Sequence, residues 1–171
     1  QELGRDDVWI NSEFGWVYNH LREYEKALIH LEKAKELGRD DEWITFEFGY
    51  SLVRLDRIEE GIEYYKKAIE LGKDDIAVNG ELGYWLDYLE KYEEAFVYLE
   101  KSKKLGRDDE WINSEMGFCL NRLERYDEAV LFLEKAIELG KKDEWVFSEL
   151  AFSLKRLNKY EESLEYFEKA K

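Results

Sequence analysis

The chain has 171 residues, which is one domain's worth of sequence and enough to bury a substantial core. Acidic residues number 41 and basic residues 26, so the formal net charge is −15. This charge argues against nucleic acid, whose phosphates are bound by Lys and Arg, and against an anionic membrane surface. It favours a basic protein or peptide as partner, although such a charge also serves only to keep a protein soluble.

The cysteine count and the terminal segment say little about location. Cys119 is the single cysteine, so no intrachain disulfide is expected. No apolar run approaches the roughly 18 residues of a membrane helix, and residues 1–7 do not resemble a secretion signal. We expect a cytoplasmic location and interpret the sequence as an excerpt of a longer chain.

A Leu-Gly pair recurs every 34 residues, starting at positions 3, 37, 71, 105 and 139. A period of this length indicates a stacked repeat array. In the segment LGRDDEW, Gly38 is predicted to end one helix in a left-handed conformation. Asp40 or Asp41 is predicted to cap the next helix, where Glu42 adds favourable charge. A metal site at the paired aspartates is disfavoured, because the segment lacks the regularly spaced oxygen ligands of a calcium loop.

Two helices are predicted in each repeat. In the first repeat Ile10, Phe14 and Val17 share one face of the first helix, and residues 24–37 show similar spacing. The link between them is so short that the two helices must be antiparallel neighbours. The predicted organisation is one continuous array, with a preceding repeat's tail at 1–7 and repeats at 8–41, 42–75, 76–109, 110–143 and, truncated, 144–171.

Small residues recur where the two helices of a repeat should touch, for example Gly15 with Ala27 and Gly117 with Ala129. Glycine inside a helix costs about 1 kcal/mol relative to alanine, so close packing is the expected reason for it. The unit from Trp9 to Asp40 resembles the tetratricopeptide repeat, a 34-residue helix-turn-helix with Gly in its first helix and Ala in its second. This chain departs from the family pattern in having no proline and in placing its tryptophan about two residues earlier.

The resemblance implies an all-α, right-handed superhelical solenoid whose first helices line a concave groove for an extended peptide or a partner helix. On the first helix a second stripe lies about a quarter-turn from the packing face. We call these positions, with their equivalents in every repeat, the aromatic-acidic stripe. The candidate ligand-binding residues are Trp9, Glu13, Trp16, Asn19, His20, Trp43, Glu47, Tyr50, Arg54, Glu81, Tyr84, Asp87, Tyr88, Trp111, Glu115, Phe118, Asn121, Arg122, Trp145, Phe152 and Arg156.

Two interpretations of this stripe stay open at the level of sequence. The rings could be packed between neighbouring first helices, or they could be partly exposed anchors for a ligand, with Asn19 and Asn121 pairing with a peptide backbone. Exposed rings at Trp16, Tyr50, Tyr84 and Phe118 would favour ligand binding, and fully buried ones a structural spacer. Likewise, the repeated glutamates either form ion pairs with arginines such as Arg122 or present negative charge to a basic ligand.

The sequence predicts a non-enzymatic protein-interaction scaffold without cofactor or metal. His20 and His30 have no repeated ligand partner, and Cys119 lies on an apolar helix, where an inert thiol is expected. The alternative function is a purely structural spacer or a self-associating array, natural or engineered. End-to-end association is expected because an array without polar caps exposes apolar surface at its ends.

Overall fold

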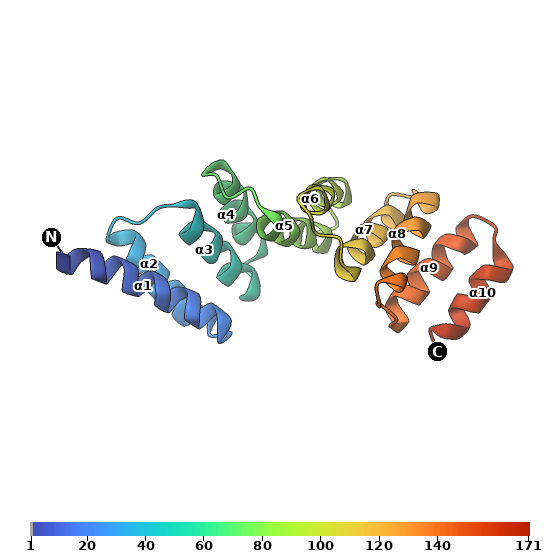
Figure 1. Ribbon diagram of the computed structural model, residues 1–171, viewed down its shortest axis with the longest axis horizontal. Coiled ribbons are helices and arrows are strands. Elements are labelled where there is room, and N and C mark those ends of the chain that lie inside the picture. Colours follow the sequence, from blue (N-terminus) through green and yellow to red (C-terminus); the bar gives the residue numbers. More distant parts are fainter. Residues whose placement is uncertain (1) are drawn as a thin grey trace. The chain divides into compact units, whose positions relative to one another are not determined.

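The computed structural model describes the backbone of residues 2–171 and the side chains from residue 7 onward. Within this range all the regular secondary structure is α-helix, as predicted (Figure 1). The helices are α1 (Glu2–His20), α2 (Tyr24–Glu36), α3 (Glu42–Arg54), α4 (Ile58–Glu70), α5 (Ile76–Tyr88), α6 (Tyr92–Lys104), α7 (Glu110–Arg122), α8 (Tyr126–Glu138), α9 (Glu144–Arg156) and α10 (Tyr160–Lys169).

The chain divides into two compact units, Gln1–Val78 and Asn79–Lys171. In the first unit α1 packs against α2 and α3 against α4, while α3 also contacts both helices of the hairpin before it. In the second unit α7 pairs with α8 and α9 with α10, and α9 contacts both helices of the α7–α8 hairpin. Each unit is therefore a stack of antiparallel helical hairpins whose first helices are neighbours.

The core of each unit lies between successive hairpins. In the first unit Leu31 and Ala34 of α2 pack with Ile44 and Phe48 of α3. In the second, a larger cluster brings together side chains from α7, α8 and α9, including Leu120, Leu133 and Leu150. Because successive hairpins within each unit bury apolar surface against one another, they are stabilised by stacking.

The helix ends after each second helix follow the predicted chemistry. Gly38 has φ +102°, its amide donates to the carbonyl of Lys35, and the Arg39 amide donates to that of Ala34, which is the Schellman arrangement. Asp41, rather than Asp40, caps α3 by accepting from the amide of Ile44 at 2.9 Å. Partial burial acts to raise the pKa of Asp41, but this hydrogen bond and the Arg39 guanidinium together hold it below its usual range.

One predicted break is wrong. The Leu3-Gly4 pair was expected to end the helix of a preceding repeat, yet α1 continues through it from Glu2 to His20. The backbone around Gly4 therefore extends the first helix.

Glycine within the first helices marks close contact between helices. A Cβ atom built on Gly117 of α7 would lie 2.6 Å from Cγ of Leu133 on α8. Leu133 is fully buried, so it has no free space into which to move. The packing explanation of the repeated glycine column is confirmed at this position.

The first helix of each hairpin also ends at a residue in the left-handed conformation, but this residue is not glycine. Arg22, Asp56, Glu90, Glu124 and Asn158 all have φ between 58° and 62°. At Glu124 the amide donates to the carbonyl of Asn121, and the next amide, of Arg125, donates to that of Leu120. A non-glycine residue in this conformation costs about 1–2 kcal/mol.

Replacing Glu124 by glycine should stabilise the protein by about 0.5–1 kcal/mol, because relief of the left-handed strain exceeds the entropic cost of glycine. The matched control is Glu134→Gly on the exposed face of α8, which should destabilise by about 1 kcal/mol. Urea unfolding followed by circular dichroism measures both. Equal destabilisation by the two substitutions would show that the turn at Glu124 is not strained.

Candidate functional site

The rings of the aromatic-acidic stripe are open on one side in both units. Trp16 is 39% exposed and Tyr84 36%, and Trp9, Tyr88 and Trp145 are exposed as well. Trp43, Tyr50, Trp111, Phe118 and Phe152 are half-buried. Trp43 packs against the core of its unit, and Phe118 lies 5.6 Å from Trp145 between ring centroids. Trp43 and Phe118 therefore pack against neighbouring helices, while Trp16 and Tyr84 expose part of their surface to solvent.

Cationic side chains of the chain itself stack on many of these rings. The guanidinium carbon of Arg107 lies 4.1 Å from the ring centroid of Trp111, and that of Arg122 lies 4.4 Å from Phe118. Similar contacts at 4.6 Å join Arg39 to Trp43 and Arg54 to Tyr50, and the His20 ring lies tilted beside Trp16 with centroids 3.9 Å apart. The stripe thus presents ring faces that attract flat cations.

Buried hydrogen bonds join neighbouring first helices at two places. In the first unit the Asn19 amide donates to Glu47 Oε2 at 2.7 Å, and Ser51 Oγ donates to Asn19 Oδ1 at 2.6 Å. The second unit repeats this arrangement with Asn121, Glu149 and Ser153, at 2.9 Å and 2.6 Å. We call each set an amide triad.

The amide triads correct part of the prediction. Asn19 is 2% exposed, Glu47 5% and Asn121 3%, so these three side chains do not offer polar groups to a ligand. The helical wheel placed them on the border of the stripe, but it describes one helix only. The neighbouring first helix covers this border, and the two amides hydrogen-bond to it.

Between α5 and α7 the corresponding positions hold Asp87, Glu115 and Cys119. Cys119 Sγ donates to Asp87 Oδ1 at 2.9 Å, as the serines of the amide triads donate to asparagine. An ionised carboxylate has no proton to donate, so Asp87 cannot bond to Glu115 as the asparagines bond to Glu47 and Glu149. Among the side chains that the structure describes, none donates a hydrogen bond to Glu115. We call Asp87 and Glu115 the carboxyl pair.

Burial first, and the neighbouring Asp87 carboxylate second, raise the pKa of Glu115 to about 7 against the opposing charges of Lys141 and Arg107. Burial also raises the pKa of Asp87, with the Cys119 hydrogen bond and the Arg122 charge opposing it. The pKa of the Cys119 thiol is raised by its burial, so it stays a protonated donor. The predicted burial of Cys119 is confirmed.

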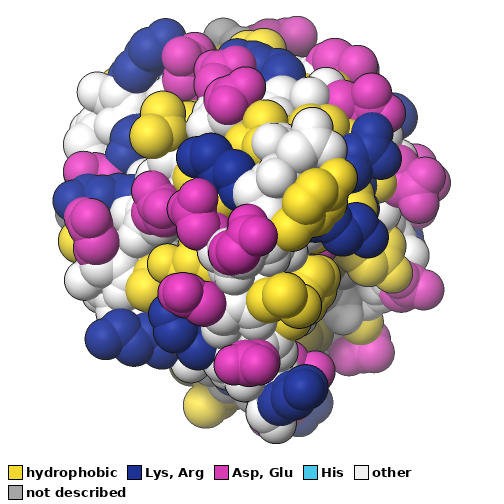
Figure 2. Space-filling view, turned by 90° about the vertical axis from the view of Figure 1, so that its right-hand side faces the viewer, with side chains coloured by type: hydrophobic (Ala, Val, Ile, Leu, Met, Phe, Trp, Pro, Cys, Tyr) yellow, Lys and Arg dark blue, Asp and Glu magenta, His cyan; other side chains and the backbone are white. Residues whose placement is uncertain are grey.

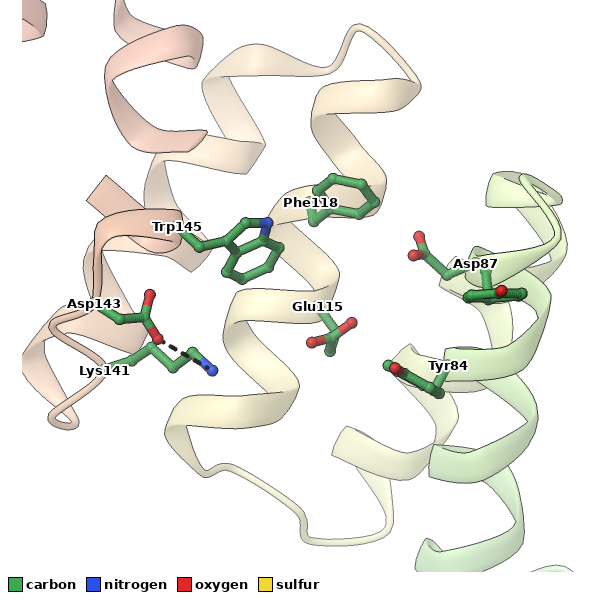
Figure 3. A pocket seen from close by; sticks show the side chains of 8 residues that line it. Tyr84, Asp87, Glu115, Phe118, Lys141, Asp143 and Trp145 are labelled. Carbon is green, nitrogen blue, oxygen red and sulfur yellow. Dashed lines mark ion pairs between the residues drawn. The ribbon is translucent and has the colours of Figure 1, made fainter. Parts of the chain in front are cut away.

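The carboxyl pair lies in a cavity of about 370 Å³ within the second unit. In Figure 3 Asp87 and Tyr84 come from α5, Glu115 and Phe118 from α7, and Trp145 from the start of α9. Both carboxylates face the space between α5 and α7. We call the cavity the carboxyl pocket, and its lining residues are Tyr84, Asp87, Tyr88, Glu115, Phe118, Lys141, Asp143 and Trp145.

The remaining stripe residues have varied surroundings. Glu81 accepts from Trp85 Nε1 at 3.1 Å, and Arg122 forms an ion pair with Glu149 at 2.9 Å. Glu13 is partly exposed on α1, beside the rings described above. Within the part of the chain that the structure describes, no group of three His, Cys, Asp or Glu side chains is placed to hold a metal ion.

Several residues that define the pocket and the triads were not predicted from the sequence. Ser51, Cys119 and Ser153 share one column of the repeat, and Lys141 and Asp143 lie in the loop before α9. The Ser, Cys and Ser of that column stand 32 residues after Asn19, Asp87 and Asn121. This constant offset was present in the sequence and could have identified the inter-repeat contacts.

Comparisons with known proteins agree with this architecture. The tetratricopeptide repeat model matches residues 46–75, 112–143 and 146–171, which together exceed half of the chain. The chain therefore belongs to the tetratricopeptide repeat family. No curated protein sequence matches it, and in the described residues no helix is long and apolar enough to cross a membrane.

Solved structures with the same fold include YrrB, described as a tetratricopeptide repeat protein with an unusual peptide-binding site. It is 24% identical with a TM-score of 0.88, over 99% of this chain and 87% of that one. MamA of MSR-1 is also 24% identical, with a TM-score of 0.86 over 96% and 95% of the chains. MamA from Desulfovibrio magneticus RS-1 is 18% identical with a TM-score of 0.86, over 96% and 93%. At these identities the likeness shows the fold alone.

The raised pKa of Glu115 predicts how the free energy of unfolding depends on pH. An unfolded glutamate has a pKa of about 4.3, whereas that of folded Glu115 is about 7, so between these values the folded chain binds more protons. The contribution of Glu115 to the free energy of unfolding therefore falls as pH rises from about 4.3 to 7 and stays low above 7. Glu115→Gln should therefore stabilise the protein at pH 8, by about 1–2 kcal/mol, and have little effect at pH 4.

Urea unfolding of the wild type and the variant across this pH range tests the prediction. Glu134→Gln, which removes an exposed carboxylate on α8, is the matched control and should shift stability little at any pH. A Glu115→Gln effect that does not change between pH 4 and pH 8 would contradict the assignment.

Proposed function

We propose that this chain is a non-enzymatic protein-interaction scaffold that binds an extended peptide or a partner helix along the first helices of its five repeats. The observation that carries the proposal is that, within each unit, the first helices expose aromatic rings interspersed with carboxylates. Partly exposed Trp and Tyr are the side chains that most often anchor protein interfaces. Family membership supports the same class, as does the peptide-binding site named for YrrB.

We propose that the partner is basic. The chain carries a net charge of −15, and the carboxylates of Asp87 and Glu115 line a cavity beside exposed rings. Charge of this sign attracts a cationic peptide and repels nucleic acid and anionic lipid. The proposed contact surface is the aromatic-acidic stripe without the buried Asn19, Glu47 and Asn121.

An array of extended synthetic peptides, varied in charge and aromatic content, tests the proposal. Basic peptides should bind to the wild-type chain, and the combined variant Trp16→Ala, Tyr50→Ala, Tyr84→Ala should bind them at least tenfold more weakly because it lacks the anchoring rings. The control variant Val97→Ala, Leu131→Ala removes side chains that are 59% and 66% exposed on second helices. Equal binding by both variants, or no binding by the wild type, would rule the proposal out.

Self-association is the second candidate function, because both ends of the described chain expose apolar side chains. On α1 Ile10, Phe14 and Val17 are 40–45% exposed, and on α10 Leu164 is 63% exposed. Figure 2 views the α10 side of the second unit, where hydrophobic side chains lie between acidic and basic ones. An interface between the α1 face of one copy and the α10 face of the next would be heterologous and would build rings or open chains.

Light scattering from about 10 µM to 1 mM tests this candidate, and the apparent mass should rise with concentration. Phe14→Glu should abolish the rise by placing a charge in the α1 face. Ile29→Glu changes a 63% exposed residue on α2 and should leave the rise unchanged. A monomer mass at every concentration would exclude self-association.

A further inference from the structure

We propose that the carboxyl pocket of the second unit binds the guanidinium group of an arginine side chain from a partner peptide. The inference rests on the proposed peptide-binding function and names the part of the ligand that this site would recognise. It is carried by a cavity that combines exposed rings with a carboxyl pair lacking the hydrogen bond found at equivalent positions.

The amide triads show which hydrogen bond the carboxyl pair lacks. Glu47 and Glu149 each accept a hydrogen bond from an asparagine of the preceding first helix. Glu115 occupies the same place in its repeat, but the residue opposite is Asp87, which accepts from Cys119. The exchange of an amide for a carboxyl group removes a donor and adds a negative charge. The site is complete only when a donor comes from elsewhere.

The cations of the chain near the pair already have carboxylates of their own. Lys141 pairs with Asp143 at 3.5 Å, Arg107 with Asp109 at 2.9 Å, and Arg122 with Glu149 at 2.9 Å. These three ion pairs are the charged groups around the carboxyl pair, and they come from α7, α9 and the loops before α7 and α9. The pocket therefore retains negative charge that its own cations do not offset.

The shape and chemistry of the pocket favour a guanidinium group over an ammonium group. A guanidinium group is planar, carries donors on its edge and stacks on aromatic faces, whereas an ammonium group is a compact point charge. The chain's own arginines already stack in this way on Phe118 and Trp111, two rings of the same stripe. In the pocket, the rings of Tyr84 and Trp145 lie beside the acceptors of the carboxyl pair, and Lys141 Nζ already lies 5.7 Å from the Trp145 ring centroid, which shows that this ring attracts a cation. Arginine satisfies both sets of groups at once.

Proton linkage follows from this binding mode. A bound cation favours the ionised carboxylate, and the pKa of Glu115 in the unbound protein is about 7. Binding is then accompanied by loss of a proton from Glu115 near neutral pH. The affinity for arginine should increase as pH rises from 6 to 8.

The experiment uses N-acetyl-arginine amide as the probe and follows the indole N–H signal of Trp145 by NMR at pH 7.5. The probe should shift this signal with saturation in the millimolar range, whereas the citrulline analogue, which is neutral and of similar shape, should not. Asp87→Asn should weaken binding at least tenfold, because it supplies the donor that completes an amide triad with Glu115. The variant should remain folded and be at least as stable as the wild type, which separates lost binding from lost structure.

Asp127→Asn is the matched control, since it makes the same change at an exposed position in the first turn of α8 and should leave the affinity unchanged. Three results would overturn the inference: citrulline shifting the signal as much as arginine does, N-acetyl-lysine amide binding equally well, or Asp87→Asn binding arginine like the wild type.

The outcome is distinguishable from that of the proposed function. If array peptides bind but the arginine probe does not, the pocket inference fails and the scaffold proposal stands. If the probe binds and no peptide does, the pocket stands and the scaffold proposal fails.

Discussion

The hydrogen bonds between neighbouring first helices are the constraint on which the rest of the site depends. Asn19 reaches Glu47 and Ser51, which lie 28 and 32 residues further along the chain, and Asn121 reaches Glu149 and Ser153 at the same separations. A buried amide left without partners costs about 1–3 kcal/mol, so a shift of one first helix along the other is penalised. These bonds hold the helices in the register that aligns the exposed rings.

Asp87 changes the hydrogen bonds that form between first helices in this register. The backbone positions at the α5–α7 contact correspond to those of an amide triad, and the bond from the smaller side chain, here Cys119, is retained. The bond to glutamate is lost, and two carboxyl groups occupy one partly buried site. Such an arrangement opposes folding at neutral pH, and proteins tend to depart from local rules of stability where a site has a function. The scaffold interpretation explains why this cost is placed beside exposed rings.

The helix boundaries could be predicted because they depend on local chemistry. Gly38 and Asp41 act within one turn of the chain, and the spacing of small residues indicated close packing at Gly117, although the side chain that fills the space there is Leu133 and not the expected Ala129. The burial of Asn19 could not be read from its helix alone, since the covering surface belongs to the next repeat. The left-handed Glu124 was also missed, because glutamate carries no preference for that conformation.

For Glu47, Glu115 and Glu149, the residue opposite on the preceding first helix decides whether the carboxylate accepts a hydrogen bond from it. Carbon-detected NMR titration of the Glu115 carboxyl group, in the wild type and in Asp87→Asn, tests it most directly. The account predicts a midpoint at a pH of about 7 in the wild type and a clearly lower one in the variant, where an amide stabilises the ionised form. An ordinary glutamate midpoint in the wild type, unchanged by the substitution, would contradict it.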